Sequence, residues 1–179
     1  MKNYLNFKTN LLVLVIILIN TIASAQTITP GKFDLSLGVE TGLPTTTQAN
    51  YTSFILGGTV RIQYGITSTL AATFTTGGYH FFPKTIPGTN ESYASFGVGP
   101  VKAGLKQFVS SNIYLGAEAG IGVEVTQQGF SGGQKKLLLS PAVGYANKHW
   151  DVAAHFESLT GQQYNYGIFA VRVAYCFGL

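Results

Sequence analysis

From residue 32 onward the sequence has one dominant pattern, in which large apolar side chains alternate with small or polar ones. The clearest case runs from Ile113 to Thr126, with Ile, Leu, Val and Ala at odd positions and Gly, Glu, Tyr and Thr at even positions. A period of two residues places the two sets on opposite faces of a β-strand. No ten-residue stretch after Gly31 has apolar residues at helical spacing. The high Gly, Thr and Tyr content likewise favours strands and turns over a helical bundle.

The alternation recurs in eight segments, and tight and longer connections take turns between them. This arrangement predicts an all-β fold, an eight-stranded antiparallel up-and-down barrel with its longer links at one end and its N-terminus at the other. The predicted strands are residues 32–42, 53–65, 68–81, 93–107, 112–126, 136–147, 150–158 and 164–178. We expect β-bulges at Pro100 and Pro141, which lack a ladder N–H, and at Gly77-Gly78 or Gly167, where the alternation slips.

The placement of charge distinguishes a membrane barrel from a soluble one. The charged residues of the predicted strands share their face with Gly, Ala, Ser and Thr, whereas the opposite faces are rows of Leu, Val, Ile and Phe. Only 10% of the residues are charged, fewer than a soluble surface usually carries. We therefore predict a transmembrane β-barrel, with the apolar rows facing lipid and the charges facing the interior.

The interior of an eight-stranded barrel is just wide enough for side chains to fill it. Charges buried there require partners, so we predict a lumenal polar network held together by ion pairs. Its predicted members are Glu40, Arg61, Glu118, Glu124, His155, Glu157 and Arg172. The same residues could also form a proton or ion path, but a plug that holds the barrel together is the favoured interpretation.

Aromatic residues predict the membrane interfaces, where amphipathic rings settle at the level of the lipid headgroups. The predicted interface aromatics beside the tight connections are Tyr64, Tyr145, Trp150, Tyr175 and Phe177. A second group lies near the longer links, where the alternation is less regular. It comprises Tyr79, Phe81, Phe82, Tyr93, Tyr164 and Tyr166.

The N-terminal segment has the organisation of a secretory signal peptide. Lys2 and Lys8 precede an apolar run over residues 11–19, and Ala23-Ser24-Ala25 supplies the small residues of a cleavage site. The run is too short for a transmembrane helix. We expect residues 1–25 to be removed, leaving residues 26–179 as a single barrel domain.

The sequence of the mature chain predicts no binding site for a nucleic acid, a metal ion or a cofactor. Removal of two lysines leaves nine basic and seven acidic residues, dispersed along the chain, so we predict no nucleic-acid partner. Cys176 is the single cysteine, which excludes a disulfide. No His or Cys spacing predicts a metal site, and no motif predicts a cofactor.

Catalysis is not predicted either. His155, Glu157 and Ser158 offer a base, an acid and a nucleophile close together in the sequence. The alternation directs Ser158 to the face opposite the other two, so the groups do not converge. We therefore predict that the protein is not an enzyme.

Several short features, taken in order, resemble those of the small bacterial outer-membrane β-barrel family of the OmpA/OmpX type. They are the Gly65-Ile66-Thr67 turn after Tyr64, Pro141 and Gly144-Tyr145 before Trp150-Asp151-Val152, and the alternating C-terminal run Tyr175-Cys176-Phe177-Gly178-Leu179. The resemblance covers nearly all of residues 31–179. It implies a location in the bacterial outer membrane, contact with outer-membrane lipids and insertion by the barrel assembly machinery.

The family has no shared activity, so three classes of function stay open. The favoured one is a structural or surface-interaction role through long polar loops such as residues 43–52 and 127–135, with any extracellular ligand unknown. The first alternative is a narrow pore for small solutes or ions. The second is a lipid-modifying outer-membrane enzyme that would depend on His155.

Overall fold

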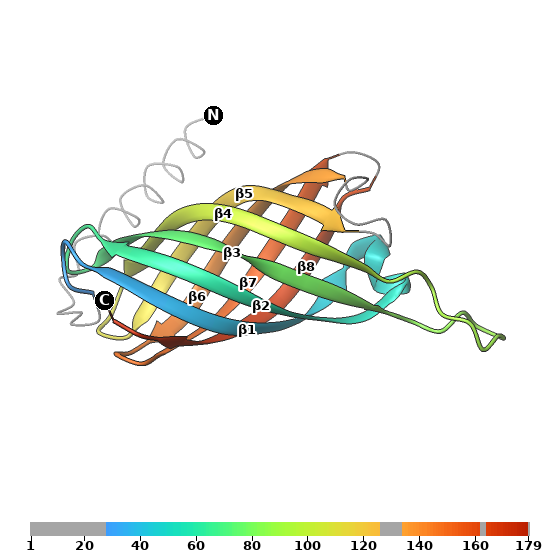
Figure 1. Cartoon of the computed structure of the whole chain (residues 1–179), viewed down its shortest axis with the longest axis horizontal. Helices are drawn as coiled ribbons and strands as arrows, with labels where there is room; N and C mark the ends of the chain where they lie inside the picture. Colours follow the sequence, from blue (N-terminus) through green and yellow to red (C-terminus); the bar gives the residue numbers. More distant parts are fainter. Residues whose placement is uncertain (1–27, 126–133, 162–163, 179) are drawn as a thin grey trace, which may run out of the picture.

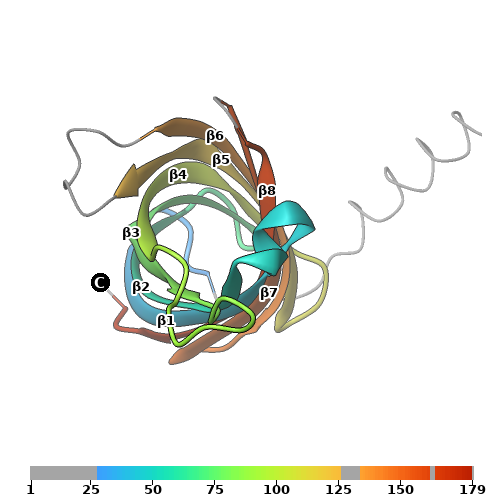
Figure 2. The same ribbon diagram turned by 90° about the vertical axis from the view of Figure 1, so that its right-hand side faces the viewer.

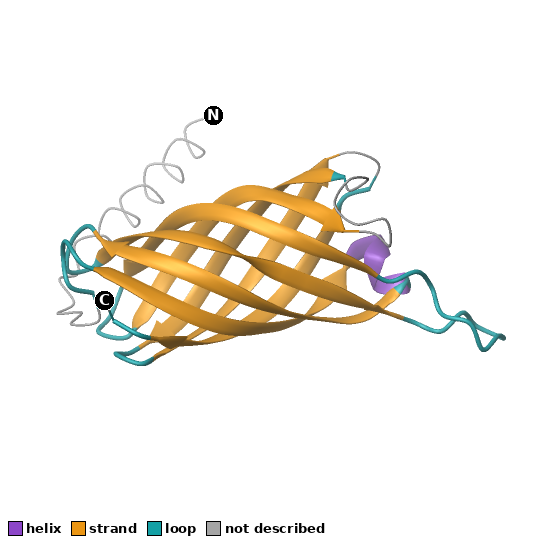
Figure 3. Ribbon diagram, viewed as in Figure 1, coloured by secondary structure: helices purple, strands orange, loops and turns teal. Residues whose placement is uncertain are grey.

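The computed structural model describes residues 28–125, 134–161 and 164–178. Within them, eight antiparallel strands form a closed barrel in which each strand pairs with the next in sequence and the last pairs with the first, so the predicted fold class is confirmed (Figures 1 and 3). The strands are β1 (Phe33–Thr45), β2 (Thr52–Gly65), β3 (Leu70–Pro83), β4 (Phe96–Phe108), β5 (Ile113–Val125), β6 (Lys135–Ala146), β7 (Trp150–Gly161) and β8 (Tyr166–Cys176). The predicted signal peptide, residues 1–25, lies outside the described residues.

Connection length separates the two ends of the barrel as the sequence predicted. The β2–β3, β4–β5 and β6–β7 turns are short, and the Asn147 side chain forms one of them by accepting hydrogen bonds from the backbone N–H groups of His149 and Trp150, both at 2.9 Å. The longer β1–β2 and β3–β4 links lie at the other end, seen along the barrel axis in Figure 2. The β1–β2 link contains a 3₁₀ helix, η1 (Thr46–Asn50), which the alternation could not predict.

The prediction of bulges at the two prolines is wrong. Pro100 pairs with Gly122 of β5 in an unbroken register, and Pro141 pairs in the same way with Ala117. The ladders on the other side of each proline omit pairs there but resume in the same register. A missing N–H therefore leaves local bonds unmade without inserting a residue.

The expected bulges at Gly77-Gly78 and Gly167 are wrong as well, because both segments keep their register with the adjacent strands. Tyr79 and Phe81 consequently share the inward face of β3 and are buried, as is Tyr166 on β8. These three rings fill the barrel and do not belong to an outer aromatic group.

The outer face of the barrel is apolar. Large Leu, Val, Ile and Phe side chains are exposed along all eight strands, as with Val39, Phe74 and Leu115. Among the described strand residues, Lys135 at one strand end is the only exposed Lys, Arg, Asp or Glu. No helix in the described part of the chain is long and apolar enough to cross a membrane.

Two apolar clusters fill the ends of the interior. The turn-end cluster, beside the short connections, consists of Ile28, Ala71, Phe108, Tyr114, Ala146 and Ala153. The loop-end cluster, toward the longer links, consists of Ile55, Tyr79, Phe81, Val98, Leu138, Leu159, Tyr166, Ile168 and Ala170. Charged side chains occupy the space between these clusters.

Candidate functional site

The charged side chains between the two clusters form one connected chain of ion pairs. We call it the ionic chain, and its members in order of contact are Lys106, Asp151, Arg61, Glu118, Lys102, Glu157, His155, Glu40 and Arg172. Acids and bases lie on six different strands because each inward position is set by the two-residue period of its own strand. The chain therefore links parts of the barrel that share no backbone ladder.

Near the turn end, Asp151 is the central group. Its Oδ2 lies 2.7 Å from Lys106 Nζ and 3.8 Å from Arg61 Nη1, and its Oδ1 accepts a 2.6 Å hydrogen bond from the Tyr114 hydroxyl. The Lys106 ammonium also lies 4.0 Å from the centroid of the Tyr114 ring, within range of a cation–π interaction. The Asp151 carboxylate is thus balanced by two cations and a phenol.

In the middle of the barrel, Glu118 joins β5 to β2, β3 and β4. Its Oε2 lies 3.1 Å from Arg61 Nη2 and 3.8 Å from Lys102 Nζ. Its Oε1 accepts hydrogen bonds from the hydroxyls of Thr73 and Thr75, at 2.8 and 2.7 Å. Both oxygens of a buried carboxylate are therefore satisfied, as its low exposure requires.

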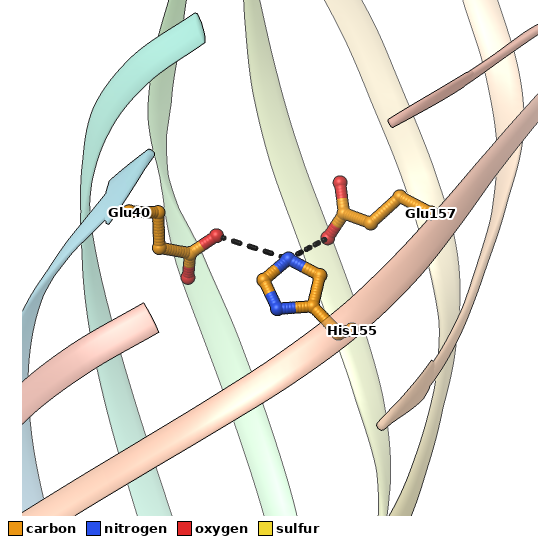
Figure 4. Close-up of side chains that lie close together, drawn as sticks. All are labelled: Glu40, His155 and Glu157. Carbon is orange, nitrogen blue, oxygen red and sulfur yellow. Dashed lines mark ion pairs between the residues drawn. The ribbon is translucent and has the colours of Figure 1, made fainter. Parts of the chain in front are cut away.

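Glu40, His155 and Glu157 meet near the loop end (Figure 4). His155 Nε2 lies 3.4 Å from Glu40 Oε2 and 3.7 Å from Glu157 Oε1. A cavity of about 10 Å³ borders all three side chains, about the smallest space that can hold one water molecule. Among the described residues, His155 Nε2 and the Oε2 atoms of both glutamates have no hydrogen-bond partner, so a water in this cavity would suit them.

This trio is also where a cation would be sought, since its ligand atoms lie within 4.8 Å of one another. Two protein cations already neutralise these carboxylates, because Lys102 Nζ contacts Glu157 and Arg172 Nε lies 3.5 Å from Glu40 Oε1. A divalent ion would have to displace them in a closed space. We therefore assign the trio to the ionic chain.

The predicted network residues are placed as follows. Glu40, Arg61, Glu118, His155, Glu157 and Arg172 are buried members of the ionic chain. Glu124 lies apart from them at the loop end, where it faces Lys136 Nζ at 3.6 Å and accepts a hydrogen bond from the Tyr166 hydroxyl at 3.0 Å.

The predicted network left out several residues that the structure buries in the interior, namely Lys102, Lys106, Lys136, Asp151 and Tyr114. Lys102 and Lys106 share the parity of β4 that faces away from Val101 and Leu105, so the period-two rule could have found both. Asp151 stood on the predicted inward face but had no obvious partner until Lys106 was placed there.

The five predicted interface aromatics all lie on the outer face and are exposed. Trp150 contacts Tyr175 edge to face with ring centroids 5.4 Å apart, and Tyr175 contacts Phe177 at 5.2 Å. Tyr64 packs against Phe33 at 4.9 Å. These rings lie beside the short turns, so the outer face carries aromatic side chains next to that end of the barrel.

A second candidate site lies among the longer links. The loop-end pocket has a volume of about 430 Å³ and receives side chains from η1, the β3–β4 link, β4 and the β7–β8 link. Its lining includes Gln48, Tyr51, Tyr93, Phe96, Tyr164 and Asn165. Tyr51 and Tyr93 contact edge to face at 5.1 Å, which joins the β1–β2 link to the β3–β4 link. The prediction of long polar loops gave no indication of this hollow.

No protein-family model matches the chain, and no curated protein is similar to it in sequence. Its fold is shared with Ail, the attachment invasion locus protein of Yersinia pestis, with a TM-score of 0.58 and 11% identity over 83% of this chain and all of that one. Ail bound to the heparin analogue sucrose octasulfate gives a TM-score of 0.51, 14% identity and the same coverage of both chains.

Two further structures share the fold. Neisserial surface protein A has a TM-score of 0.54 and 15% identity, over 81% of this chain and 97% of that one. A de novo designed transmembrane β-barrel has a TM-score of 0.51 and 16% identity, over 83% of this chain and 98% of that one. The chain therefore has the fold of the small outer-membrane β-barrels. Because a designed barrel shares it too, this fold alone carries no function.

Proposed function

We propose that the protein is an integral protein of the bacterial outer membrane whose interior is closed by side chains and whose activity lies at its longer links. The observation that carries this proposal is the inversion of polarity between the two faces. Charges lie inside the barrel and are paired there, whereas the exposed outer side chains are apolar. A water-soluble barrel would have the opposite arrangement.

Strand length supports a membrane-spanning role. The strands contain 11 to 14 residues, and a tilted strand needs about 9–11 residues to cross the hydrocarbon layer. The aromatic side chains beside the short turns would then lie among the lipid headgroups. The signal peptide expected over residues 1–25 supports export from the cytosol, and insertion would require the barrel assembly machinery.

The interior does not favour the narrow-pore alternative. A conducting lumen needs a continuous polar path, but the ionic chain has the turn-end cluster on one side and the loop-end cluster on the other. Phe81 and Leu138 are fully buried in the second of these clusters. We therefore expect the lumen to conduct no ions.

The enzyme alternative lacks access to its base. His155 is 6% exposed and lies between two glutamates inside the barrel, where a lipid acyl group has no approach from the membrane. Ser158 points away from it, toward the outer face of β7. The loop-end pocket, by contrast, is lined by exposed side chains such as Tyr164, so a ligand can reach it.

Selective labelling tests both the location and the orientation. Thr47→Cys on η1 should react with a membrane-impermeant maleimide on intact cells, whereas Ser68→Cys in a short turn should react only after the outer membrane is permeabilised. Native Cys176 is buried and serves as the unlabelled background. Equal labelling of the two positions on intact cells would overturn the proposed orientation.

Two measurements test the closed membrane barrel. The detergent-extracted protein should migrate differently on an SDS gel before and after boiling, because a closed strand ladder resists the detergent. Planar bilayers containing the folded protein should show no single-channel steps. Recovery of a compact monomer from buffer without detergent would overturn the membrane assignment, and steps altered by Arg61→Ala or Glu118→Ala would overturn the closed interior.

A further inference from the structure

We infer that the loop-end pocket binds a neutral saccharide. This inference rests on the proposed function, because it requires the longer links to face the cell exterior. It goes further by assigning the binding to one hollow and one class of ligand. Four features support it: the aromatic lining, the amide side chains, the absence of ionised lining residues and the size of the pocket.

Aromatic rings form the floor and walls of the pocket. Phe96 stacks on Phe81 with ring centroids 4.2 Å apart and meets Tyr166 edge to face at 6.2 Å, so the floor is anchored in the loop-end cluster. Tyr164 also lines the pocket and is 74% exposed. The face of an aromatic ring carries partial negative charge. The C–H groups on the flat side of a pyranose carry partial positive charge, so a sugar ring can stack on this face.

Amide and hydroxyl side chains lie beside the rings. Gln48 donates through Nε2 to Thr52 Oγ1 at 2.9 Å, which fixes the orientation of its amide group. Asn165 accepts a 3.1 Å hydrogen bond from the Gly161 N–H at Oδ1, which fixes the second amide. Oriented amides both donate and accept hydrogen bonds, as the hydroxyls of a sugar require.

Among the described residues, the lining contains no Asp, Glu, Lys or Arg. Three charged groups beside the lining residues already have protein partners. Lys84 Nζ donates to the Ala49 carbonyl at 2.7 Å. Lys136 Nζ donates to the Tyr164 carbonyl at 2.6 Å and faces Glu124, which in turn accepts from the Tyr166 hydroxyl. A sulfated or uronic-acid sugar would therefore meet no ionised side chain in the described lining, and the Lys136 cation beside it is already paired with Glu124. The ligand class therefore differs from the sulfated sugar present in the Ail complex, and we expect an uncharged sugar.

The volume of about 430 Å³ falls in the range of sites for small organic ligands, about 300–1,000 Å³. Such a site holds one or two sugar rings, so the residues that contact the ligand directly should dominate the affinity. Tyr51 and Tyr164 lie on different links and offer separate stacking surfaces. Loss of either ring should weaken binding without unfolding the barrel.

The test is a glycan array probed with the folded protein, followed by calorimetric titration of maltose, cellobiose and lactose. The protein must be kept in a detergent without a sugar headgroup, because a maltoside would itself compete for the pocket. We expect binding to at least one neutral glycan. Tyr51→Ala and Tyr164→Ala should each weaken it about tenfold, the loss typical of one aromatic contact.

Tyr64→Ala is the matched control, because it removes an exposed tyrosine at the opposite end of the barrel and should leave the affinity unchanged. Array binding restricted to sulfated or uronic-acid glycans, or no binding to any neutral glycan, would overturn the inference. Neither result would affect the labelling and gel tests above, so failure of the ligand class is distinguishable from failure of the membrane assignment.

Discussion

Lys102 of β4 and Glu157 of β7 form an ion pair across the barrel interior, although their strands are not neighbours in the sheet. Each side chain is only 1% exposed. The same glutamate oxygen accepts a 3.2 Å hydrogen bond from the Tyr79 hydroxyl. The pair therefore joins opposite walls of the barrel and connects the ionic chain to the loop-end cluster.

Removing one member of this pair should destabilise the barrel strongly. Lys102→Ala leaves the buried Glu157 carboxylate without its closest cation, and a broken buried pair typically costs about 3–5 kcal/mol. Urea unfolding in lipid vesicles, followed by the fluorescence of the single tryptophan, Trp150, measures this loss.

The double variant Lys102→Met/Glu157→Leu should recover much of that stability, since apolar residues of similar size carry no unpaired charge. Lys32→Ala removes an exposed lysine and should change the free energy of unfolding little. A Lys102→Ala protein as stable as the Lys32→Ala control would contradict an energetic role for the pair.

Gly144 on β6 gives the Tyr114 ring its space. A Cβ atom at this position would lie 2.4 Å from Tyr114 Cζ, and the hydrogen bond to Asp151 keeps the ring from moving away. Gly144→Ala should therefore cost about 1–3 kcal/mol through overpacking. Gly116→Ala is the control, because a Cβ atom at Gly116 would lie no closer than 3.6 Å to any neighbouring atom. This variant should unfold at nearly the same urea concentration as the wild type.

A charged side chain introduced on the outer face of the barrel should impair folding into the membrane. Val39 is exposed on β1, midway along the strand, so Val39→Arg would place a guanidinium in the hydrocarbon layer at a cost of about 2–4 kcal/mol. Folding yield into vesicles, read from the unboiled gel, should fall. Asn90→Arg introduces the same side chain in the exposed β3–β4 link and should fold normally; equal yields would argue against lipid contact at Val39.

Divalent metal ions should not stabilise the protein through the Glu40, His155 and Glu157 trio. Lys102 and Arg172 already balance the two carboxylates, so Zn²⁺ or Mn²⁺ would have to displace a buried cation. Thermal unfolding should have the same midpoint with either ion and with a chelator. An upward shift with Zn²⁺ that His155→Ala abolishes would identify a metal site instead.

The two-residue period was enough to predict the eight strands and most of their inward faces. It needs only local information, so residues such as Arg61 and Arg172 could be placed in the interior before any partner was known. The interruption at Gly77-Gly78 was misread because two small residues hide the period. Their unbroken ladder with β2 keeps Tyr79 and Phe81 facing inward.

Partner identity could not be predicted in the same way. Which acid meets which base depends on the closure of the barrel, as with Lys106 of β4 and Asp151 of β7. The loop-end pocket depends on η1 and on how separate links fold over the barrel, and strand periodicity contains no information about either. Local pattern thus determines the strands, whereas the sites arise from contacts distant in sequence.

The ionic chain includes Glu40 of β1 and Arg172 of β8, the first and last strands. These two side chains can form their ion pair only when β1 and β8 lie side by side, so an unclosed sheet would leave both charges unpaired. An intermediate in which β1 and β8 are not yet paired would expose unpaired charged side chains to the hydrocarbon of the bilayer. Assembly in the lipid should therefore be nearly all-or-none, with closure of the β1–β8 seam as the committing event.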